Sequence, residues 1–471
     1  MPSRPTRWSL TFTSTLAALA VSCSNGEEPS DAGARHAWAP GEVLYDTPAP
    51  DPRGWLDLRG LIHAHSVYSH DACDGKPRDG ETGPVNEPCL DSFRRALCRT
   101  EHDFVMLTDH NTSFGDSEFP DVLLYREAAG DALIRRDGKP VANRAACPDE
   151  GHPVLVMAGT ESATVAVGLE AHVSPDIETR HAVYGEATAE AIETMKAHGA
   201  ISLLMHTDEW TVEQITTLPV DGFEMYNLHA NALRGAGGAL SLISKLRTPE
   251  ELPQSDLVFL PIVNEDPRYT DTWGSVLATG ARRVTTMATD CHENTFPQIL
   301  PDGERIDSYR RMMLWFSNHL LVKPKPDGSW DDTSLKDALR AGRLYGAFEI
   351  FGYPLGFDYH ATDGDAAREM GEGASLAAGA TLHVTRPSVS LLDRRAQAPV
   401  ITVKLLRARE GGWDTVAEGQ DDLDYTPTAP GAYRAEVRIV PRHLREYLAS
   451  YAELADQDFV WIYANPIYVT E

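Results

Sequence analysis

Basic side chains are scarce in this sequence. Lysine and arginine total 42 against 70 aspartate and glutamate among 471 residues, which gives a formal net charge of −28. A surface of that sign repels phosphate backbones and anionic membrane surfaces. We therefore expect no nucleic-acid partner, and we expect most of the acidic excess to be ordinary solvated surface.

Sequence motifs of two common enzyme classes are also missing. The chain contains no G-x-S-x-G, and its glycine-rich runs, GAGGA at residue 235 and GEGAS at residue 371, are not in a P-loop context. We therefore predict neither a serine-nucleophile hydrolase nor a phosphate-cradling loop. The chain likewise shows no internal repeat.

Long hydrophobic runs are missing as well. The apolar stretch 8–21 follows two arginines and is too short to span a membrane, which is typical of a bacterial secretory signal over residues 1–22. LAALAVSC resembles a lipoprotein signal that ends in a lipidated Cys23, whereas the Ala-Leu-Ala at 18–20 could serve as an ordinary cleavage site. Residues 23–50 read as a flexible tether. We expect a protein of the bacterial cell envelope, in the periplasm or outer membrane, that meets the membrane through a lipid on Cys23.

Export would place the remaining five cysteines in an oxidising compartment, where disulfides persist. Cys291 lies inside a motif of ligand-type residues, so two bridges are expected among Cys73, Cys89, Cys98 and Cys147. Three pairings of four cysteines are possible. We predict Cys73–Cys89, which closes a short loop, and Cys98–Cys147, which ties the following helix to the loop before HPVLVMAG. Cys291 is then free.

Residues 51–362 alternate short apolar runs with helical patterns. Helical spacing at 89–103 and at 187–200 is followed in each case by a strand-like run. Such alternation predicts an α/β fold with a parallel sheet, for which a closed barrel is a natural form at this length. The predicted strands cover 54–62, 104–108, 152–159, 201–205, 221–227, 256–263, 282–289 and 310–316.

Residues 363–471 have a different pattern. Short alternating runs of β-branched and aromatic residues, such as PVITVKLLRA and GAYRAEVRIV, are separated by Gly, Pro and Asp. Strands of this kind with frequent turn residues predict a small β-sandwich after the barrel.

Metal-ligand residue types follow the apolar runs of the first region. Taken singly, each has an ordinary explanation, such as a helix cap or a buried core histidine. The carboxyl ends of parallel strands open onto one face of a barrel, so residues more than 200 positions apart would converge there. Buried together, these ionisable groups would be costly unless metal ions neutralised them. The residues are His63, His65, Asp109, His110, Glu161, His206, His229, Asp290 and His292.

The order HAH…SHD, TDHN, GTE, MH, NLH and TDCH resembles the successive motifs of the polymerase and histidinol phosphatase (PHP) domain. This family has a distorted seven-stranded β/α barrel that holds two or three metal ions, and the resemblance covers roughly residues 55 to 350. The closing NPIYV and the GRLYGAFE segment resemble the branch that includes carbaryl hydrolases. The resemblance implies as metal ligands His63, His65, His110, Glu161, His206, His229, Asp290 and His292.

Two positions depart from the family pattern. The first motif usually places Asp or His a few residues after its second histidine, and this chain offers both His70 and Asp71, of which we favour Asp71. The third motif is commonly Gly-Ile-Glu, and here Thr160 replaces the apolar residue while Glu161 remains. Neither departure removes a ligand.

Mixed imidazole and carboxylate ligands suit zinc, manganese or iron. Two or three such ions, bridged by Glu161 or Asp290, would hydrolyse an ester through metal-bound hydroxide, with Asp290, His292 and His229 taking part in catalysis. A phosphoester is the expected substrate; a carboxyl or carbamate ester is the first alternative, and a non-catalytic surface-binding lipoprotein is the second. Phosphate recognition would need a basic side chain. The candidates are Arg234, Arg268 and Arg343.

Overall fold

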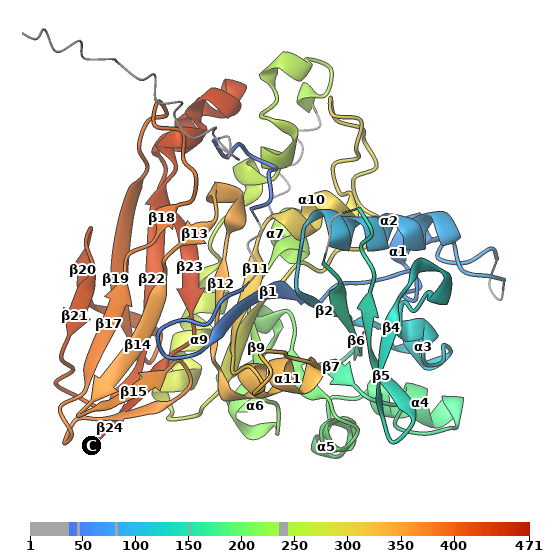
Figure 1. Ribbon diagram of the computed structural model, residues 1–471, viewed down its shortest axis with the longest axis horizontal. Helices are drawn as coiled ribbons and strands as arrows, with labels where there is room; N and C mark the ends of the chain where they lie inside the picture. The colour runs from blue at the N-terminus through green and yellow to red at the C-terminus, as the bar shows by residue number, and fades with distance from the viewer. Residues whose placement is uncertain (1–36, 45–47, 81–82, 150–151, 235–243) are drawn as a thin grey trace, which may run out of the picture. The chain divides into compact units, whose positions relative to one another are not determined.

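A computed structural model describes residues 37–44, 48–80, 83–149, 152–234 and 244–471 of the chain. Its core is a closed barrel of seven strands, in which each strand pairs with the next and the last returns to the first (Figure 1). In barrel order the strands are β1 (Leu56–Ile62), β2 (Phe104–Met106), β6 (Val154–Glu161), β7 (Val165–Leu169), β8 (Ile201–Leu204), β9 (Gly222–Asn227) and β10 (Val284–Ala288).

The barrel is mixed rather than all-parallel. Strand β7 runs antiparallel to both β6 and β8, while the other barrel pairs are parallel. The sequence analysis did not identify β7, because VAVGL at 165–169 has no alternation to distinguish it from a loop. The predicted fold class is nevertheless confirmed: an α/β protein with a closed seven-stranded barrel is followed by antiparallel strands.

The barrel interior is apolar below the strand ends. Each strand except β9 and β10 sends two or more side chains into this cluster, and α11 (Asp332–Ala341) adds Leu335 and Leu339 to it. A capping box between Asp331 and Ser334 starts this helix, and Gly342 ends it at a φ of 73°. The interior side chains are Leu58, Ile62, Phe104, Met106, Leu155, Met157, Val165, Val167, Ile201 and Leu203.

Strand β1 joins the barrel to the rest of the sheet. Only its last residue, Ile62, pairs with β10, and its earlier residues pair antiparallel with β11 (Ser317–Val322). The side-chain amide of Asn318 on β11 bonds both the N–H and the carbonyl of Met287 on β10, at 2.8 Å each. This amide replaces the main-chain pairing where β10 and β11 diverge.

The sheet continues from β11 into the C-terminal part through β12 (Leu344–Ala347), which pairs with β23 (Phe459–Ala464). A second sheet packs on it: Tyr359 of β14 donates its hydroxyl to the carbonyl of Tyr433 on β22. The continuing strands are β16 (Gly373–Ser375), β19 (Val400–Arg409), β20 (Gly412–Gly419), β22 (Gly431–Val440) and β24 (Ile467–Thr470). The second sheet holds β15 (Ala366–Glu369), β14 (Asp358–Asp363), β17 (Thr381–Thr385) and β21 (Leu423–Tyr425).

The division into residues 51–362 and 363–471 stays a prediction. The predicted signal at 1–22 and the lipidation site Cys23 lie outside the described residues. Trp38, in the predicted tether, is buried, and its main-chain N–H donates to the carbonyl of Leu391 at 2.9 Å. None of the described helices has the length and apolar character needed to cross a membrane.

Two predicted strands are wrong. Residues 256–263 form the short 3₁₀ turns η5 (Ser255–Leu257) and η6 (Leu260–Ile262), because Pro261 has no N–H for a strand ladder. Residues 310–316 belong mainly to α10 (Tyr309–Leu314), where the Ser308 side chain accepts from the N–H of Arg311. A short apolar run does not by itself distinguish a buried helix from a buried strand.

The helices expected at 89–103 and 187–200 are present as α2 (Glu87–Arg99) and α5 (Ala189–Ala197). Both predicted disulfides, Cys73–Cys89 and Cys98–Cys147, are confirmed, and Cys291 is free and buried. Burial raises the pKa of the Cys291 thiol to about 12, so this thiol stays protonated and unreactive. Two disulfides indicate an oxidising compartment outside the cytoplasm.

Candidate metal centre

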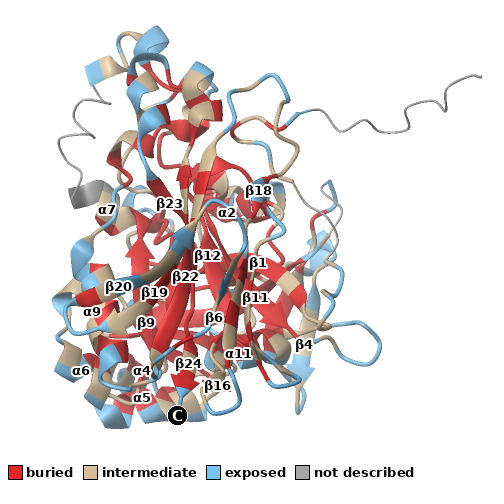
Figure 2. Ribbon diagram, turned by 90° about the vertical axis from the view of Figure 1, so that its left-hand side faces the viewer, coloured by how far each residue is buried: buried red, intermediate tan, exposed pale blue. Residues whose placement is uncertain are grey.

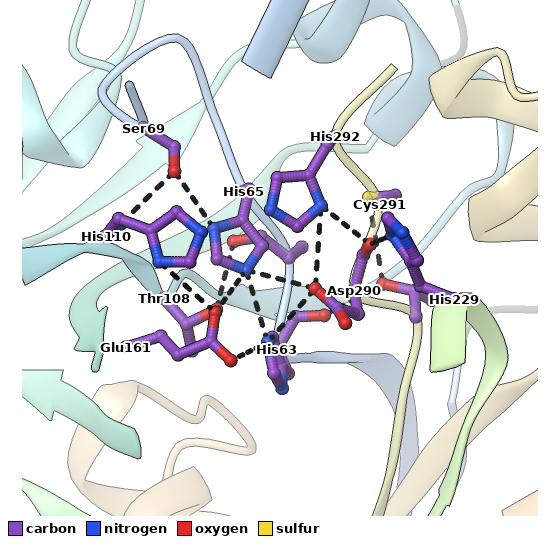
Figure 3. A network of polar contacts seen from close by, with 12 residues as sticks. His63, His65, Ser69, Thr108, His110, Glu161, His229, Asp290, Cys291 and His292 are labelled. Atoms are coloured by element: carbon purple, nitrogen blue, oxygen red, sulfur yellow. Dashed lines mark hydrogen bonds and ion pairs between the residues drawn. The ribbon is translucent and has the colours of Figure 1, made fainter. Parts of the chain in front are cut away.

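The ends of the barrel strands bring the predicted ligand residues to one place (Figure 3). His63 and His65 follow β1, His110 ends β3 (Asp109–His110), and Glu161 ends β6. The others stand at the next strand ends: His206 follows β8, His229 lies in α7 (Leu228–Arg234) after β9, and Asp290 and His292 follow β10. The barrel thus brings together side chains from along the chain between His63 and His292, which are far apart in the sequence.

Four fully buried residues form the inner group: His63, His65, Glu161 and Asp290. Their facing atoms are closely spaced. The Nε2 atoms of the two histidines are 3.2 Å apart, and each lies 2.9 to 3.4 Å from a carboxylate oxygen of Glu161 and from Oδ1 of Asp290. Four ligands that hold a tetrahedral ion at about 2.1 Å stand about 3.4 Å from one another. The inner group therefore has the spacing of a metal site.

Two further groups overlap the inner one. His65 also belongs to a group with His110 and His292, while Asp290 also belongs to a group with His229 and His292. The two oxygens of Glu161 face different neighbours: Oε1 is 3.3 Å from His63, and Oε2 is 3.5 Å from Nδ1 of His110. Shared residues of this kind can hold more than one ion, with a carboxylate between them.

Asp71 and His70 lie differently. Oδ2 of Asp71 is 3.4 Å from Nε2 of both His110 and His292, whereas His70 is exposed and its ring lies beside that of His110. Asp71 is therefore the better placed of the two. His206 stands at the margin of the cluster, where its Nε2 is 3.8 Å from Oε1 of Glu161.

Hydrogen bonds at Nδ1, on the ring side away from the other ligands, orient the two inner histidines. Nδ1 of His65 lies 3.1 Å from the Ser69 hydroxyl, and Nδ1 of His63 bonds Glu224 of β9. A hydrogen bond at Nδ1 fixes the tautomer and leaves Nε2 free to bind a metal, as is common for ligating histidines. The sequence analysis missed both partners. Glu224 could have been found because it is a charged residue within the predicted buried strand DGFEMYN, whereas nothing in the sequence singled out Ser69.

The carbonyl of Asp290 holds the other two histidines. Nδ1 of His229 and Nδ1 of His292 lie 3.0 and 2.9 Å from this oxygen. The Asp290 carboxylate accepts from Nδ2 of Asn227 at 3.2 Å. Nε2 of His292 is buried and has no hydrogen-bond partner in the described structure, so it is free to take an external ligand.

The backbone is strained at this site. His63, His206 and Asp290 have φ values of 70°, 46° and 53°, in the left-handed region that side chains with a Cβ rarely adopt. Each such residue costs about 1–3 kcal/mol and persists where the surroundings enforce it. Here the strain turns each side chain from its strand end into the barrel mouth.

The charges of the inner group do not balance without protons or cations on it. Burial alone would lower the pKa of the two inner histidines, but Glu161 and Asp290 outweigh it and raise the pKa of His65 to about 9 and that of His63 well above its usual value. Against the effect of burial, the same contacts keep the pKa of Glu161 and Asp290 below the usual range. Burial and the neighbouring charge of His65 lower the pKa of His292 to about 3. Metal ions would replace the protons on His63 and His65.

The proposed phosphate-binding arginines lie away from the cluster or outside the description. Arg343 lies over the ring of Trp55, and Arg268 pairs with Asp208 and Asp266. The side chain of Arg234 is outside the described residues. In the described part of the chain, no lysine or arginine pairs with the carboxylates of the inner group.

A narrow cavity reaches the cluster from one side. His229 and His292 line it together with the apolar residues Phe259, Phe296 and Met312, and the rest of the lining is polar or acidic: Glu293, Asn294, Thr295 and Asp307. The cavity has a volume of only about 10 Å³, so an uncharged substituent could contact its apolar side chains but could not enter it without their movement.

Comparison with protein-family models, with curated proteins and with solved structures returns no match for this chain. The centre is therefore interpreted from its own geometry: a seven-stranded mixed barrel with buried, overlapping histidine and carboxylate groups that can hold one or more metal ions.

Proposed function

We propose that this protein is an exported metal-dependent hydrolase of ester bonds. The observation that carries the proposal is the inner group, in which four buried ligand-type atoms stand at metal-site spacing with two further groups sharing its members. The order of the motifs, which resembles that of PHP-domain hydrolases, supports the same function. The donor set of imidazole and carboxylate fits zinc, manganese or iron.

The ligands would be His63, His65, Asp71, His110, Glu161, His206, His229, Asp290 and His292. Bound divalent ions would supply Lewis acidity and lower the pKa of a water molecule.

The chain's own residues would position the reaction. Asn227 donates to Oδ2 of Asp290 and so keeps Oδ1 toward His63 and His65, where this carboxylate would help to hold a metal ion and orient the attacking water. Glu224 and Ser69 fix the two inner imidazoles, and the contacts of Nδ1 of His229 and His292 with the Asp290 carbonyl leave their Nε2 atoms free to hold a metal ion. The rigid barrel holds these groups in one geometry before substrate arrives.

Phosphoester hydrolysis is the first substrate class that we propose; because the expected basic side chain is not beside the cluster in the described structure, the metal ions themselves would have to neutralise the phosphoryl group. A neutral carboxyl or carbamate ester is the second candidate. A specific observation favours it: three apolar side chains, Phe259, Phe296 and Met312, stand beside His229 and His292, and no described basic side chain pairs with the cluster. A lipid on Cys23 would place either activity at the membrane.

The test is hydrolysis by the purified full chain, loaded separately with zinc, manganese or iron. The substrates are nitrophenyl phosphate, bis-nitrophenyl phosphate and nitrophenyl acetate. We expect turnover that is lost on chelation and restored by metal, and the ranking of kcat/KM identifies the ester class. Full metal content without hydrolysis of any substrate would favour the surface-binding alternative instead.

Phe296→Ala is the matched variant for substrate class. It removes one apolar wall of the cavity and no metal-ligand candidate. If the neutral ester packs against this apolar side chain, kcat/KM should fall for nitrophenyl acetate and change little for the phosphate esters. An equal fall for all three substrates would argue against a cavity that selects the ester class.

A further inference from the structure

A second cavity, of about 530 Å³, is lined by four arginines: Arg282, Arg283, Arg340 and Arg368. Val284, the first residue of β10, also lines it. Asp290 lies six positions further along the chain, and at about 3.3 Å per residue this places the metal-centre end of β10 about 20 Å away. Figure 2 shows β16, β24 and α11, which contribute to the cavity wall, near one another at its lower edge. The cavity is therefore separate from the candidate metal centre.

Two acidic residues in the wall are already engaged elsewhere. The Asp221 carboxylate lies 3.2 Å from Nζ of Lys196 and accepts from the N–H of Ser202 at 2.9 Å. The Glu372 carboxylate accepts from the N–H of Glu369 at 3.1 Å, within its own turn. Neither carboxylate forms an ion pair with an arginine of the cavity among the described residues. The positive charge of the cavity is therefore not cancelled by the wall itself.

The four guanidinium groups are of two kinds. That of Arg283 contributes positive charge but its N–H donors are used, whereas the other three keep N–H donors that are unused within the described chain. Arg283 donates to the carbonyls of Ile215, Thr216 and Leu218, so its charge is fixed in place without a counter-ion. Arg282 is exposed and lies over the ring of Tyr468, 4.5 Å from its centroid, and has no ion pair within the described chain.

The other two arginines are partly engaged. Arg340 donates to the carbonyl of Gly199 at 3.1 Å, and its closest carboxylate, on Asp337, is 3.9 Å away. Arg368 uses only Nε for Asp363 and keeps its outer N–H groups free. These unused donors come from three different elements: the segment before β10, the end of α11, and β15.

Glycine keeps the cavity open. A Cβ added at Gly373 would stand 3.4 Å from a guanidinium nitrogen of Arg282, so a side chain there would enter the space in front of this arginine. The backbone at Gly373 is outside the left-handed region and does not require glycine, in contrast to Gly371, whose φ is 82°. Gly373 is thus a position where the cavity can be filled without straining the chain.

We propose that this cavity binds a small molecule that carries a phosphate group. Several guanidinium groups with free N–H donors match the geometry of phosphate oxygens and form charge-assisted hydrogen bonds with them. Four arginines against the two carboxylates of the wall also stand out in a chain of net charge −28, whose overall field would otherwise repel such a ligand. The volume exceeds that of a bare phosphate and leaves room for an organic part. The site is independent of the proposed hydrolase function.

The test is calorimetric binding of phenylphosphonate, which cannot be hydrolysed as an ester, to the metal-loaded full chain at constant ionic strength. Arg282→Gln and Arg340→Gln should each weaken binding about tenfold, as expected for a lost charge-assisted hydrogen bond, and Gly373→Glu should abolish it. Arg395→Gln is the matched control, because it removes one exposed arginine from a loop where it pairs with Asp393. This control should bind as the wild type does.

The Asp290→Asn variant separates the two sites. Phenylphosphonate binding at the arginine cavity should survive this change, whereas binding at the metal centre should not. Binding that is lost in Asp290→Asn and unchanged in the Arg282→Gln, Arg340→Gln double variant would overturn the proposal, as would the absence of binding to the wild type. Cosedimentation with phosphatidylglycerol vesicles distinguishes the source of the phosphate: dependence on Arg282 and Arg340 there identifies a lipid headgroup, and its absence identifies a soluble ligand.

Discussion

Strand β1 carries two buried clusters of charge that differ in kind. On the face opposite Leu58, Arg59 pairs with Glu349, and His319 lies between Asp57 and Glu349 at 2.9 and 3.2 Å. At the end of the same strand stands the inner group. The Arg59 network, made of Arg59, Glu349, His319 and Asp57, contains as many cationic as anionic groups. The inner group contains two carboxylates and only histidines to face them.

The Arg59 network satisfies its own donors as well as its charges. Arg59 also donates to the carbonyls of Thr100 and Glu101 at 2.7 and 2.8 Å. In the inner group, by contrast, two of four residues have left-handed backbone. A buried charged cluster that contains a permanent cation and is unstrained stabilises the fold, whereas one that is strained and has only protonated histidines to balance its carboxylates is arranged for something it must bind.

The comparison is tested most strongly by Asp290→Asn. This change keeps the shape of the side chain and removes a negative charge from the inner group, so metal content should fall and turnover should drop by about two to four orders of magnitude. Metal stoichiometry, melting temperature and hydrolysis rate are measured on one preparation. Asp103→Asn is the control: Asp103 is equally buried but accepts from the N–H of Arg59. An active, fully loaded Asp290→Asn protein would contradict the assignment of the centre.

Glu349→Gln should give the reverse result. Breaking a buried ion pair by removing one partner costs about 3–5 kcal/mol, so the free energy of unfolding should fall by that order in denaturant titrations. Metal content per folded molecule should stay at the wild-type value. A loss of metal with unchanged stability would show that the two clusters are not separate in function.

Glu224→Gln tests whether the hydrogen bond to Nδ1 of His63 supports metal binding. It replaces the carboxylate behind His63 with a neutral amide and leaves every proposed ligand in place. Metal affinity should weaken about 10- to 100-fold, which is the usual effect of removing the partner of a ligating histidine. Competition with a chelator of known affinity measures this. An unchanged affinity would mean that Glu224 is only a packing residue.

The pH dependence of stability gives the smallest effect. Burial alone would lower the pKa of His319, but Asp57 and Glu349 outweigh it and raise that pKa to about 9. The folded state therefore binds a proton more tightly than the unfolded state, so this contribution is complete below about pH 6.5 and is lost as the pH rises toward 9. His319→Gln should flatten the fall in unfolding free energy over that window. A variant as pH-sensitive as the wild type would show that other groups are responsible.

The sequence predicted the candidate site better than the partners that support it. His63, His65, Glu161 and Asp290 were identified because a ligand residue directly after an apolar run is a local signal. Glu224 and Ser69 act on those histidines through tertiary contacts, which no local pattern records. The barrel was predicted from alternating elements, but the antiparallel β7 could not be, because strand direction depends on which neighbour it pairs with.

The Cys73–Cys89 disulfide bears on how the molecule matures. The N–H of Cys73 donates to the carbonyl of His292 at 3.0 Å, and the amide of Asn294 donates to the carbonyl of Asp71 at 3.1 Å. The loop that the disulfide closes is thus hydrogen-bonded to the segment that carries His292. A newly made chain that is still reduced lacks this cross-link, so we expect it to hold the loop of Asp71 less firmly against the segment of His292 than the oxidised chain does. Metal content measured on oxidised and on reduced preparations of the same protein therefore tests whether the closed loop is needed for the site.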